Sequence, residues 1–237
     1  MEMILKNKIS VLIPAAGLGK RSDLNYPKSL FKVKNIPIIV RIIKKISKYD
    51  SQPSIVINSK YQKLFKKTLN DHLIKKYELL FQNFPSGMGD AVLKFKKSKF
   101  FKKTDHILLI WGDIPFIKKS SIDKLIKFHL SSSNFMSILS NYSYKPYTLI
   151  KRDQNSIVKE IIETKDSGLK FNYGERDIGI FIFKKSLLNY LKNNKIKNEH
   201  NFLYVIKKIY HKKYSIKSLP IASDKETLSL NYVSDLK

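Results

Sequence analysis

KISVLIPAAGLGKR, residues 8–21, is the stretch that decides the fold. Its first seven residues form a short apolar run, which ends at the small residues Ala15, Ala16 and Gly17. This pattern predicts a buried strand that enters a loop at its carboxyl end. Gly17 and Gly19 do not complete GxGxxG, and the loop is not GxxxxGK[ST], so two common phosphate-binding motifs are excluded.

Predicted strands and helices alternate beyond this loop. Alternation of this kind predicts a parallel sheet whose ligands bind at the carboxyl ends of the strands. We predict strands at 53–59, 78–83, 106–113 and 135–140, and helices at 36–48, 61–77 and 119–130. After residue 141 the pattern changes, with strand candidates at 156–163 and 177–183, helices near 185–193 and 199–211, and a polar loop at 192–201.

The composition excludes several classes of protein. The 237 residues contain no cysteine, which excludes a disulfide scaffold, a Cys-ligated metal site and a thiol nucleophile. No apolar run reaches the ~20 residues of a membrane span. The apolar stretch near the N-terminus is better interpreted as a core strand than as a signal peptide, so we expect a cytoplasmic protein.

Basic residues dominate the charge. The formal net charge is +27, with 46 Lys and Arg against 19 Asp and Glu. Such an excess is typical of nucleic-acid-binding proteins. However, the lysines are spread along the whole chain and only four of the basic residues are arginine, at positions 21, 41, 152 and 176, which favours a compositional bias instead. A positive field would still gather phosphorylated substrates.

Charged and amide side chains follow three of the predicted strands. Arg21 and Lys28 follow the glycine loop, where two cations can clamp a triphosphate and offset charge developing on its α-phosphate. Four residues separate Gln82 from Gly87. By itself this pattern fits a glutamine at the end of a strand and a glycine at the N-cap of a helix. Asp113 leaves the apolar strand HILLIWGD, where a carboxylate is costly unless it is solvated, paired or metal-bound. Mg²⁺ prefers such oxygen ligands.

Together these segments resemble the sugar-1-phosphate nucleotidylyltransferases, most closely the uridylyltransferase (pyrophosphorylase) domain of the bacterial N-acetylglucosamine-1-phosphate uridylyltransferases. The resemblance is carried by Ala-Ala-Gly-x-Gly-x-Arg and Pro-Lys within 15–28, Gln-x4-Gly-x-Gly at 82–89 and Gly-Asp-x-Pro at 112–115. It implies an α/β, Rossmann-like (GT-A-like) fold, with a central mixed, mostly parallel sheet flanked by helices. It also implies one nucleotidyltransferase domain over 1–237, with a nucleotide-binding part at 1–140 and a sugar-binding and C-terminal part at 141–237. The acetyltransferase half of those proteins does not follow, so we expect one activity.

On the nucleotide side, the resemblance implies a Mg²⁺-dependent reaction of an NTP with a sugar 1-phosphate. The implied catalytic cations are Arg21 and Lys28, and the implied Mg²⁺ ligands are Asp113 and Asn231. The implied nucleotide-binding residues are Ala15, Ala16, Gly17, Gly19, Gln82, Gly87 and Met88. UTP is our first expectation, because the Gln82 segment resembles that of the uridylyltransferases. CTP is our second, because Met88 and Asp90 stand where the family has Thr and His.

On the acceptor side, the resemblance implies sugar-binding roles for Thr148, Glu163, Asp177 and Glu199. Asp177 stands where the family has Asn, so it adds a charge and loses an amide donor. Because these motifs fit less well, a CTP-dependent cytidylyltransferase acting on a sugar, alcohol or choline phosphate stays open. The alternative from another class is a basic nucleic-acid-binding protein whose catalytic site has decayed. If the protein is the enzyme, we expect it neither to bind nucleic acid nor to insert into a membrane. The sequence leaves the oligomeric state open.

Overall fold

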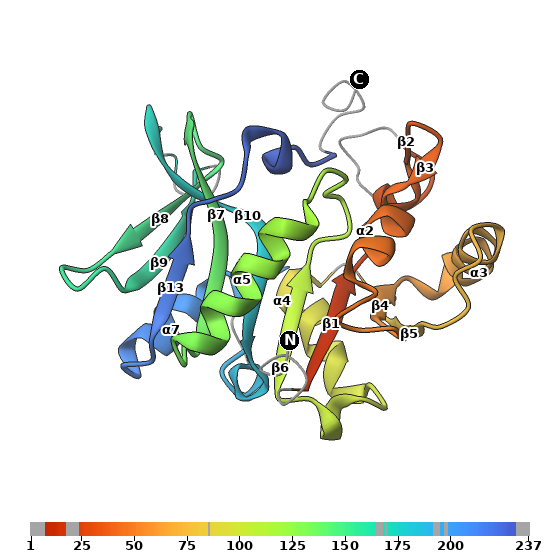
Figure 1. Ribbon diagram of the computed structural model, residues 1–237, viewed down its shortest axis with the longest axis horizontal. Coiled ribbons are helices and arrows are strands. Elements are labelled where there is room, and N and C mark those ends of the chain that lie inside the picture. The colour runs from red at the N-terminus through yellow and green to blue at the C-terminus, as the bar shows by residue number, and fades with distance from the viewer. Residues whose placement is uncertain are drawn as a thin grey trace.

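The computed structural model has a seven-stranded mixed sheet at its centre (Figure 1). It describes residues 8–17, 24–84, 86–164, 168, 170–191, 195–196 and 199–230. The strands are hydrogen-bonded in the order β13-β7-β10-β6-β1-β4-β5. Their bounds are β1 Ile9–Pro14, β4 Ser54–Ile57, β5 Glu78–Phe81, β6 His106–Ile110, β7 Met136–Tyr144, β10 Tyr173–Lys184 and β13 Ile216–Leu219. The expected α/β fold with a central mixed, mostly parallel sheet is confirmed.

Strand direction brings the candidate residues to one edge. β1 runs parallel to β4 and β6, β4 parallel to β5, and β13 parallel to β7. β10 runs antiparallel to both β6 and β7. The beginning of β10 therefore lies at the edge where β1 and β6 end, so residues far apart in the sequence meet there.

Helices cover both faces of the sheet. Along β6, Leu108 and Ile110 join a core cluster that contains the apolar sides of α2 (Ile38–Ile46), α3 (Gln62–Asp71) and α5 (Lys119–Ser131). Ile107 and Leu109 point to the other face, where α4 (Met88–Leu93) and α7 (Tyr204–His211) pack. Among the described residues, no helix combines the length and apolar character that a membrane crossing needs.

The later elements differ from the sequence-based prediction. The helix expected near 185–193 is a 3₁₀ turn, Lys185–Asn189, and α7 begins only at Tyr204, because Glu199–His200 (β12) pairs with Lys195–Ile196 (β11). β13 was not predicted, since it has four residues and buries only two of them. A separate hairpin is formed by β8 (Thr148–Arg152) and β9 (Val158–Glu163), and the short β2 (Lys32–Val33) pairs with β3 (Ile36–Pro37).

Buried His129 on α5 predicts a pH-dependent stability. Its ring nitrogens lie 3.0 Å from the Ser137 hydroxyl and 3.0 Å from a ring nitrogen of His106. Burial lowers the pKa of His129 to about 3, and the nearby His106 and Lys184 act in the same direction. The unfolded chain therefore binds a proton that the folded chain rejects, so stability falls as pH drops below about 6.5. We expect a loss of about 2 kcal/mol in the free energy of unfolding between pH 7 and pH 5.

Urea unfolding at several pH values tests this expectation. His129→Leu should lower the stability at pH 7 but flatten its dependence on pH between 7 and 5. His211→Gln, which removes an exposed histidine at the end of α7, is the matched control and should keep the wild-type slope. An unchanged slope in His129→Leu would assign the pH dependence to other groups.

Candidate functional site

The ends of β1 and β6 and a bend in β10 meet at the carboxyl edge of the sheet. The Gly112 N–H donates to the Pro14 carbonyl at 3.0 Å, and the Trp111 N–H donates to the Gly179 carbonyl at 3.0 Å. Gly112 lies so close to β1 that a Cβ atom would be 2.7 Å from the Pro14 oxygen. These contacts hold Asp113, the next residue, between the glycine loop and β10.

The glycine loop begins at this junction. The Ala15 N–H is already used, since it donates to the Val56 carbonyl at 2.7 Å. Ala16 is partly exposed and Gly17 is exposed, and a Cβ atom on Gly17 would meet no atom within 4 Å. The start of the loop therefore leaves room for a ligand to approach the backbone. Gly19 and Arg21, predicted at the nucleotide phosphates, lie outside the described residues.

The positive charge of Lys28 acts on Asp113 at the same edge. Lys28 begins the 3₁₀ turn η2 (Lys28–Leu30). Burial raises the pKa of the Asp113 carboxyl above its usual value, and the positive charge of Lys28 opposes that rise. A predicted phosphate-binding cation is thus near enough to a predicted metal ligand to influence its charge. The charge of Asp113 is costly in the folded protein, which is typical of a carboxylate that awaits a cation.

The last described residue of the chain also reaches Asp113. The Leu230 N–H donates to the Asp113 carbonyl oxygen at 3.1 Å, and the Leu230 side chain is buried. Asn231, predicted as the second Mg²⁺ ligand, comes next in the sequence and lies outside the described residues.

Gln82 is fixed by a residue that the sequence analysis noted only as a departure. Its Nε2 donates to the Gly87 carbonyl at 2.9 Å and to Asp90 Oδ2 at 3.0 Å. Ser86 Oγ also donates to Asp90 Oδ2, at 2.7 Å. Burial alone would raise the pKa of Asp90, but hydrogen bonds from Ser86 and Gln82 and the nearby Lys94 lower it, so Asp90 is ionised. Because the amide nitrogen faces Asp90, the Gln82 oxygen lies on the other side of the carboxamide.

Gly87 lies against Gln82, since its carbonyl accepts from the Gln82 amide, and Met88 follows Gly87 in the sequence. Gly87 precedes the first residue of α4, and Met88 is that residue, with 39% of its surface exposed. The His200 N–H donates to the Ser86 carbonyl at 2.8 Å, which ties this turn to β12.

Three of the four predicted sugar-binding residues form one corner. Thr148 Oγ1 donates to Asp177 Oδ2 at 2.6 Å, and the Gly179 N–H donates to Asp177 Oδ1 at 2.9 Å. Glu163 is the cross-strand partner of Thr148 in the β8–β9 hairpin. Glu199 lies in β12, but its side chain is outside the described residues.

Sequence reasoning missed one partner in this corner, Asn201. Asn201 Nδ2 donates to Glu163 Oε2 at 2.5 Å, and Asn201 Oδ1 accepts from the Leu203 N–H at 2.9 Å. Asn201 is 38 residues from Glu163 in the sequence, so only the fold reveals their contact.

An α/β sheet with a glycine loop, an amide and a carboxylate gathered at its carboxyl edge defines a nucleotide-binding class of fold. Comparison with known proteins gives the family. Residues 11–172 match the model of the MobA-like NTP transferase domain. The chain therefore belongs to the MobA-like NTP transferase family, in agreement with the resemblance of its motifs.

Curated relatives and one solved structure are also similar to this chain. The chain is 31% identical over 206 residues to the bifunctional protein GlmU of Thermosipho melanesiensis, covering 84% of this chain and 43% of that protein. It is 30% identical over 239 residues to GlmU of Buchnera aphidicola subsp. Schizaphis graminum, covering 96% and 49%. The chain thus spans about half the length of these curated relatives. A crystal structure named as a glucose-1-phosphate thymidylyltransferase from Bacillus anthracis, in complex with a sucrose, has a TM-score of 0.73 at 19% identity, covering 90% of this chain and 87% of that one.

Proposed function

We propose that this chain is a sugar-1-phosphate nucleotidylyltransferase that uses UTP and Mg²⁺ and releases pyrophosphate. The observation that carries the proposal is the position of the Asp113 carboxylate at the junction of β1, β6 and β10, where it feels the positive charge of Lys28. A relative from Acanthamoeba polyphaga mimivirus, 30% identical over 165 residues, is named a probable UDP-N-acetylglucosamine pyrophosphorylase, which supports a substrate of this kind. The structure named as a glucose-1-phosphate thymidylyltransferase shares the fold.

The proposed reaction is an in-line displacement. An oxygen of the sugar phosphate attacks the α-phosphorus of the NTP, a new P–O bond forms, and the bond to the leaving pyrophosphate breaks. Lys28 and Arg21 would balance charge on the triphosphate, and the backbone of residues 15–19 would approach the nucleotide closely. The rate gain would come from positioning and from charge stabilisation rather than from a protein nucleophile.

The donor set at Asp113 fits Mg²⁺. Asp113 offers carboxylate oxygens, and within the described ranges no group of three or more Cys, His, Asp or Glu side chains converges into a protein-only metal cage. Mg²⁺ is commonly held by one or two protein oxygens, with waters and substrate phosphates completing its shell. We propose Asp113 and Asn231 as its ligands. When bound, Mg²⁺ would supply positive charge to the α-phosphate and the incoming phosphate.

UTP is the preferred nucleotide in this proposal because of Gln82. Its NH₂ group is directed to Gly87 and Asp90, which leaves the carboxamide oxygen as an acceptor. Such an acceptor suits a ring N–H donor of the kind that uracil carries. On the acceptor side, the carboxylates of Asp177 and Glu163 can accept hydrogen bonds from sugar hydroxyls, which favours a sugar over a simple alcohol phosphate.

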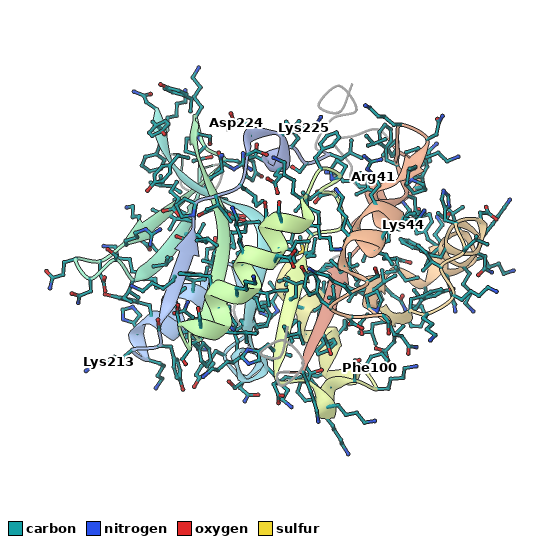
Figure 2. The ribbon with its side chains drawn as sticks, viewed as in Figure 1. Arg41, Lys44, Phe100, Lys213, Asp224 and Lys225 are labelled. Carbon is teal, nitrogen blue, oxygen red and sulfur yellow. The ribbon has the colours of Figure 1, made fainter. Side chains whose placement is uncertain are left out.

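Nucleic-acid binding is less well supported as the main function. In the view of Figure 2, the basic side chains that are drawn project in many directions, and Lys44 and Lys213 lie on opposite sides of the molecule. Over the described residues, such a scattered distribution provides no stripe that would follow a phosphate backbone.

Pyrophosphate release with Mg²⁺ tests the proposal, using the four NTPs against sugar 1-phosphates, alcohol phosphates and choline phosphate. We expect release from UTP and a hexose 1-phosphate, and none when EDTA replaces Mg²⁺. Release from CTP and an alcohol phosphate would replace the proposed substrates by the cytidylyltransferase alternative. No NTP binding together with steeply salt-dependent nucleic-acid binding would refute the enzyme.

A further inference from the structure

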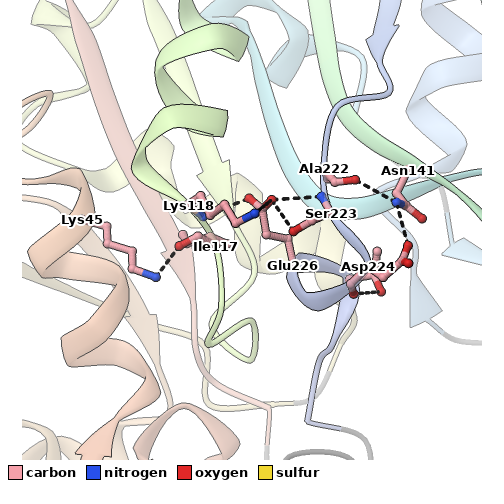
Figure 3. Close-up of polar contacts among 9 residues, drawn as sticks. Lys45, Ile117, Lys118, Asn141, Ala222, Ser223, Asp224 and Glu226 are labelled. Carbon is pink, nitrogen blue, oxygen red and sulfur yellow. Dashed lines mark hydrogen bonds and ion pairs between the residues drawn. The ribbon is translucent and has the colours of Figure 1, made fainter.

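The loop that carries Asp113, residues 111–118, is held on one side by helix α2. Arg41 Nε donates to the Pro115 carbonyl at 3.3 Å. Lys45 Nζ donates to the Ile117 carbonyl (Figure 3). Two basic side chains of one helix therefore fix two alternate carbonyl groups of this loop.

A second segment, which we call the C-terminal strap (residues 222–230), holds both ends of the same loop. The Leu230 N–H donates to the Asp113 carbonyl, as described above. At the other end, the Lys118 N–H donates to Glu226 Oε1 at 2.9 Å (Figure 3). Between these ends, Lys225 Nζ lies 5.3 Å from the centre of the Phe116 ring.

Glu226 is the polar centre of the strap. Only 1% of its surface is exposed, and its Oε2 accepts from both the N–H and the hydroxyl of Ser223 at 3.0 Å. Burial alone would raise the pKa of Glu226, but hydrogen bonds from Ser223, Lys118 and Ser121 lower it, so the carboxylate is ionised. A buried charge is tolerated only with such a full set of donors. The same carboxylate thereby closes the 3₁₀ turn η7 (Asp224–Thr227) and joins it to the Asp113 loop.

The far end of the strap is anchored to the sheet. Asn141 Nδ2, on β7, donates to the Ala222 carbonyl at 2.8 Å and to Asp224 Oδ1 at 3.2 Å (Figure 3). With this anchor behind it, a displacement of Glu226 would be transmitted to Leu230 and to Lys118, and so to both ends of the Asp113 loop.

We propose that Glu226 is a positioning residue for the Asp113 carboxylate: it locks the C-terminal strap to the Asp113 loop so that Asp113 is held ready for its metal. The proposal rests on the proposed function, in which Asp113 binds Mg²⁺. Glu226 reaches the Asp113 loop directly at the Lys118 N–H and, along the strap, through the Leu230 N–H. Residues that orient a metal ligand in this indirect way commonly change metal affinity or activity by about 10–100-fold when they are replaced.

Glu226→Gln, with Asp224→Asn as the matched control, tests the proposal. Both changes remove one negative charge from the same 3₁₀ turn, but Asp224 is exposed and its replacement can still accept from Asn141. For Glu226→Gln we expect the Mg²⁺ concentration for half-maximal activity to rise by about 10-fold, with kcat reduced and the KM for the NTP unchanged. Asp224→Asn should match the wild type in all three.

Hydrogen–deuterium exchange without metal or substrate provides a readout that does not depend on activity. In Glu226→Gln the amides of residues 113, 114 and 116–118 should exchange about 10-fold faster, while those of β4 keep their wild-type rate. If Glu226→Gln does not fold, Ser223→Ala, which removes one donor to Glu226, should show the same pattern more weakly.

The outcomes separate this proposal from the proposed function. Unchanged exchange in residues 113–118, or faster exchange spread evenly over the protein, would overturn the positioning role whatever the activity. Faster local exchange with an unaltered Mg²⁺ requirement would also overturn it, since Glu226 would then be structural only. A wild-type protein inactive toward every substrate pair would refute the proposed function instead.

Discussion

Asp113→Asn is expected to lower kcat for pyrophosphate release by about 10³-fold, because a metal that stabilises the reacting phosphates contributes several kcal/mol to the transition state. The same change should leave the folded protein intact. Burial raises the pKa of the Asp113 carboxyl, so its ionised form costs stability at pH 7, where the unfolded chain carries that charge in water. In metal-free buffer we therefore expect the Tm of Asp113→Asn to equal or exceed that of the wild type by about 2–4 °C.

The opposite signs of these two effects make the test specific. Asp71→Asn removes an exposed carboxylate at the end of α3 and should change neither kcat nor Tm. Steady-state pyrophosphate release and differential scanning calorimetry give the two quantities. If Asp113→Asn kept more than about a tenth of the wild-type kcat, which corresponds to less than about 1.4 kcal/mol in the barrier, Asp113 would not hold the catalytic metal.

The parts of the site that the sequence predicted follow strand ends. Asp113 and the small residues at 15–17 come directly after apolar runs, and parallel strands place such positions at one edge of the sheet. Local sequence is sufficient to predict these residues, because a residue that directly follows a strand lies at the edge of the sheet where that strand ends. The corner of Thr148 and Asp177 was predicted only through the family resemblance, because β8 and β10 meet through a contact 29 residues apart.

The parts that could not be predicted depend on contacts between distant segments. Glu226 reaches the Lys118 N–H across 108 residues, and nothing in its neighbourhood distinguishes it from any other helix-capping glutamate. Asp90 is close to Gln82 in sequence, yet its role depends on the orientation of the Gln82 amide, which no pattern encodes. The antiparallel placement of β10 between β6 and β7 likewise required the fold, because strand periodicity is the same in either direction.

Gly179→Ala is the prediction with the second largest effect. Gly179 has a φ of +78°, and a Cβ atom there would lie 2.3 Å from Trp111 Cδ1 and 2.8 Å from Ile114 Cδ1. The left-handed backbone costs an alanine about 1 kcal/mol, and the overlap with the partly buried Trp111 and the buried Ile114 adds about 1–3 kcal/mol. For a protein of this size, each kcal/mol of lost stability lowers the Tm by about 2–4 °C. We therefore expect Gly179→Ala to lower the Tm by about 10 °C.

Gly168→Ala is the control that separates these two causes. Gly168 has a φ of +67° but nothing within 4 Å of the added Cβ, so it carries the backbone cost without the overlap. Its Tm should fall by only about 2–4 °C, and its kcat should be unchanged. Gly179→Ala should also have a lower kcat at temperatures where it is folded. Trp111 and Ile114 flank Gly112 and Asp113 in the sequence, so a displacement of their side chains would also displace Asp113. Equal losses of Tm in the two variants would mean that the side chains of Trp111 and Ile114 move aside at little cost in stability. In that case this bend of β10 would not define the position of Asp113.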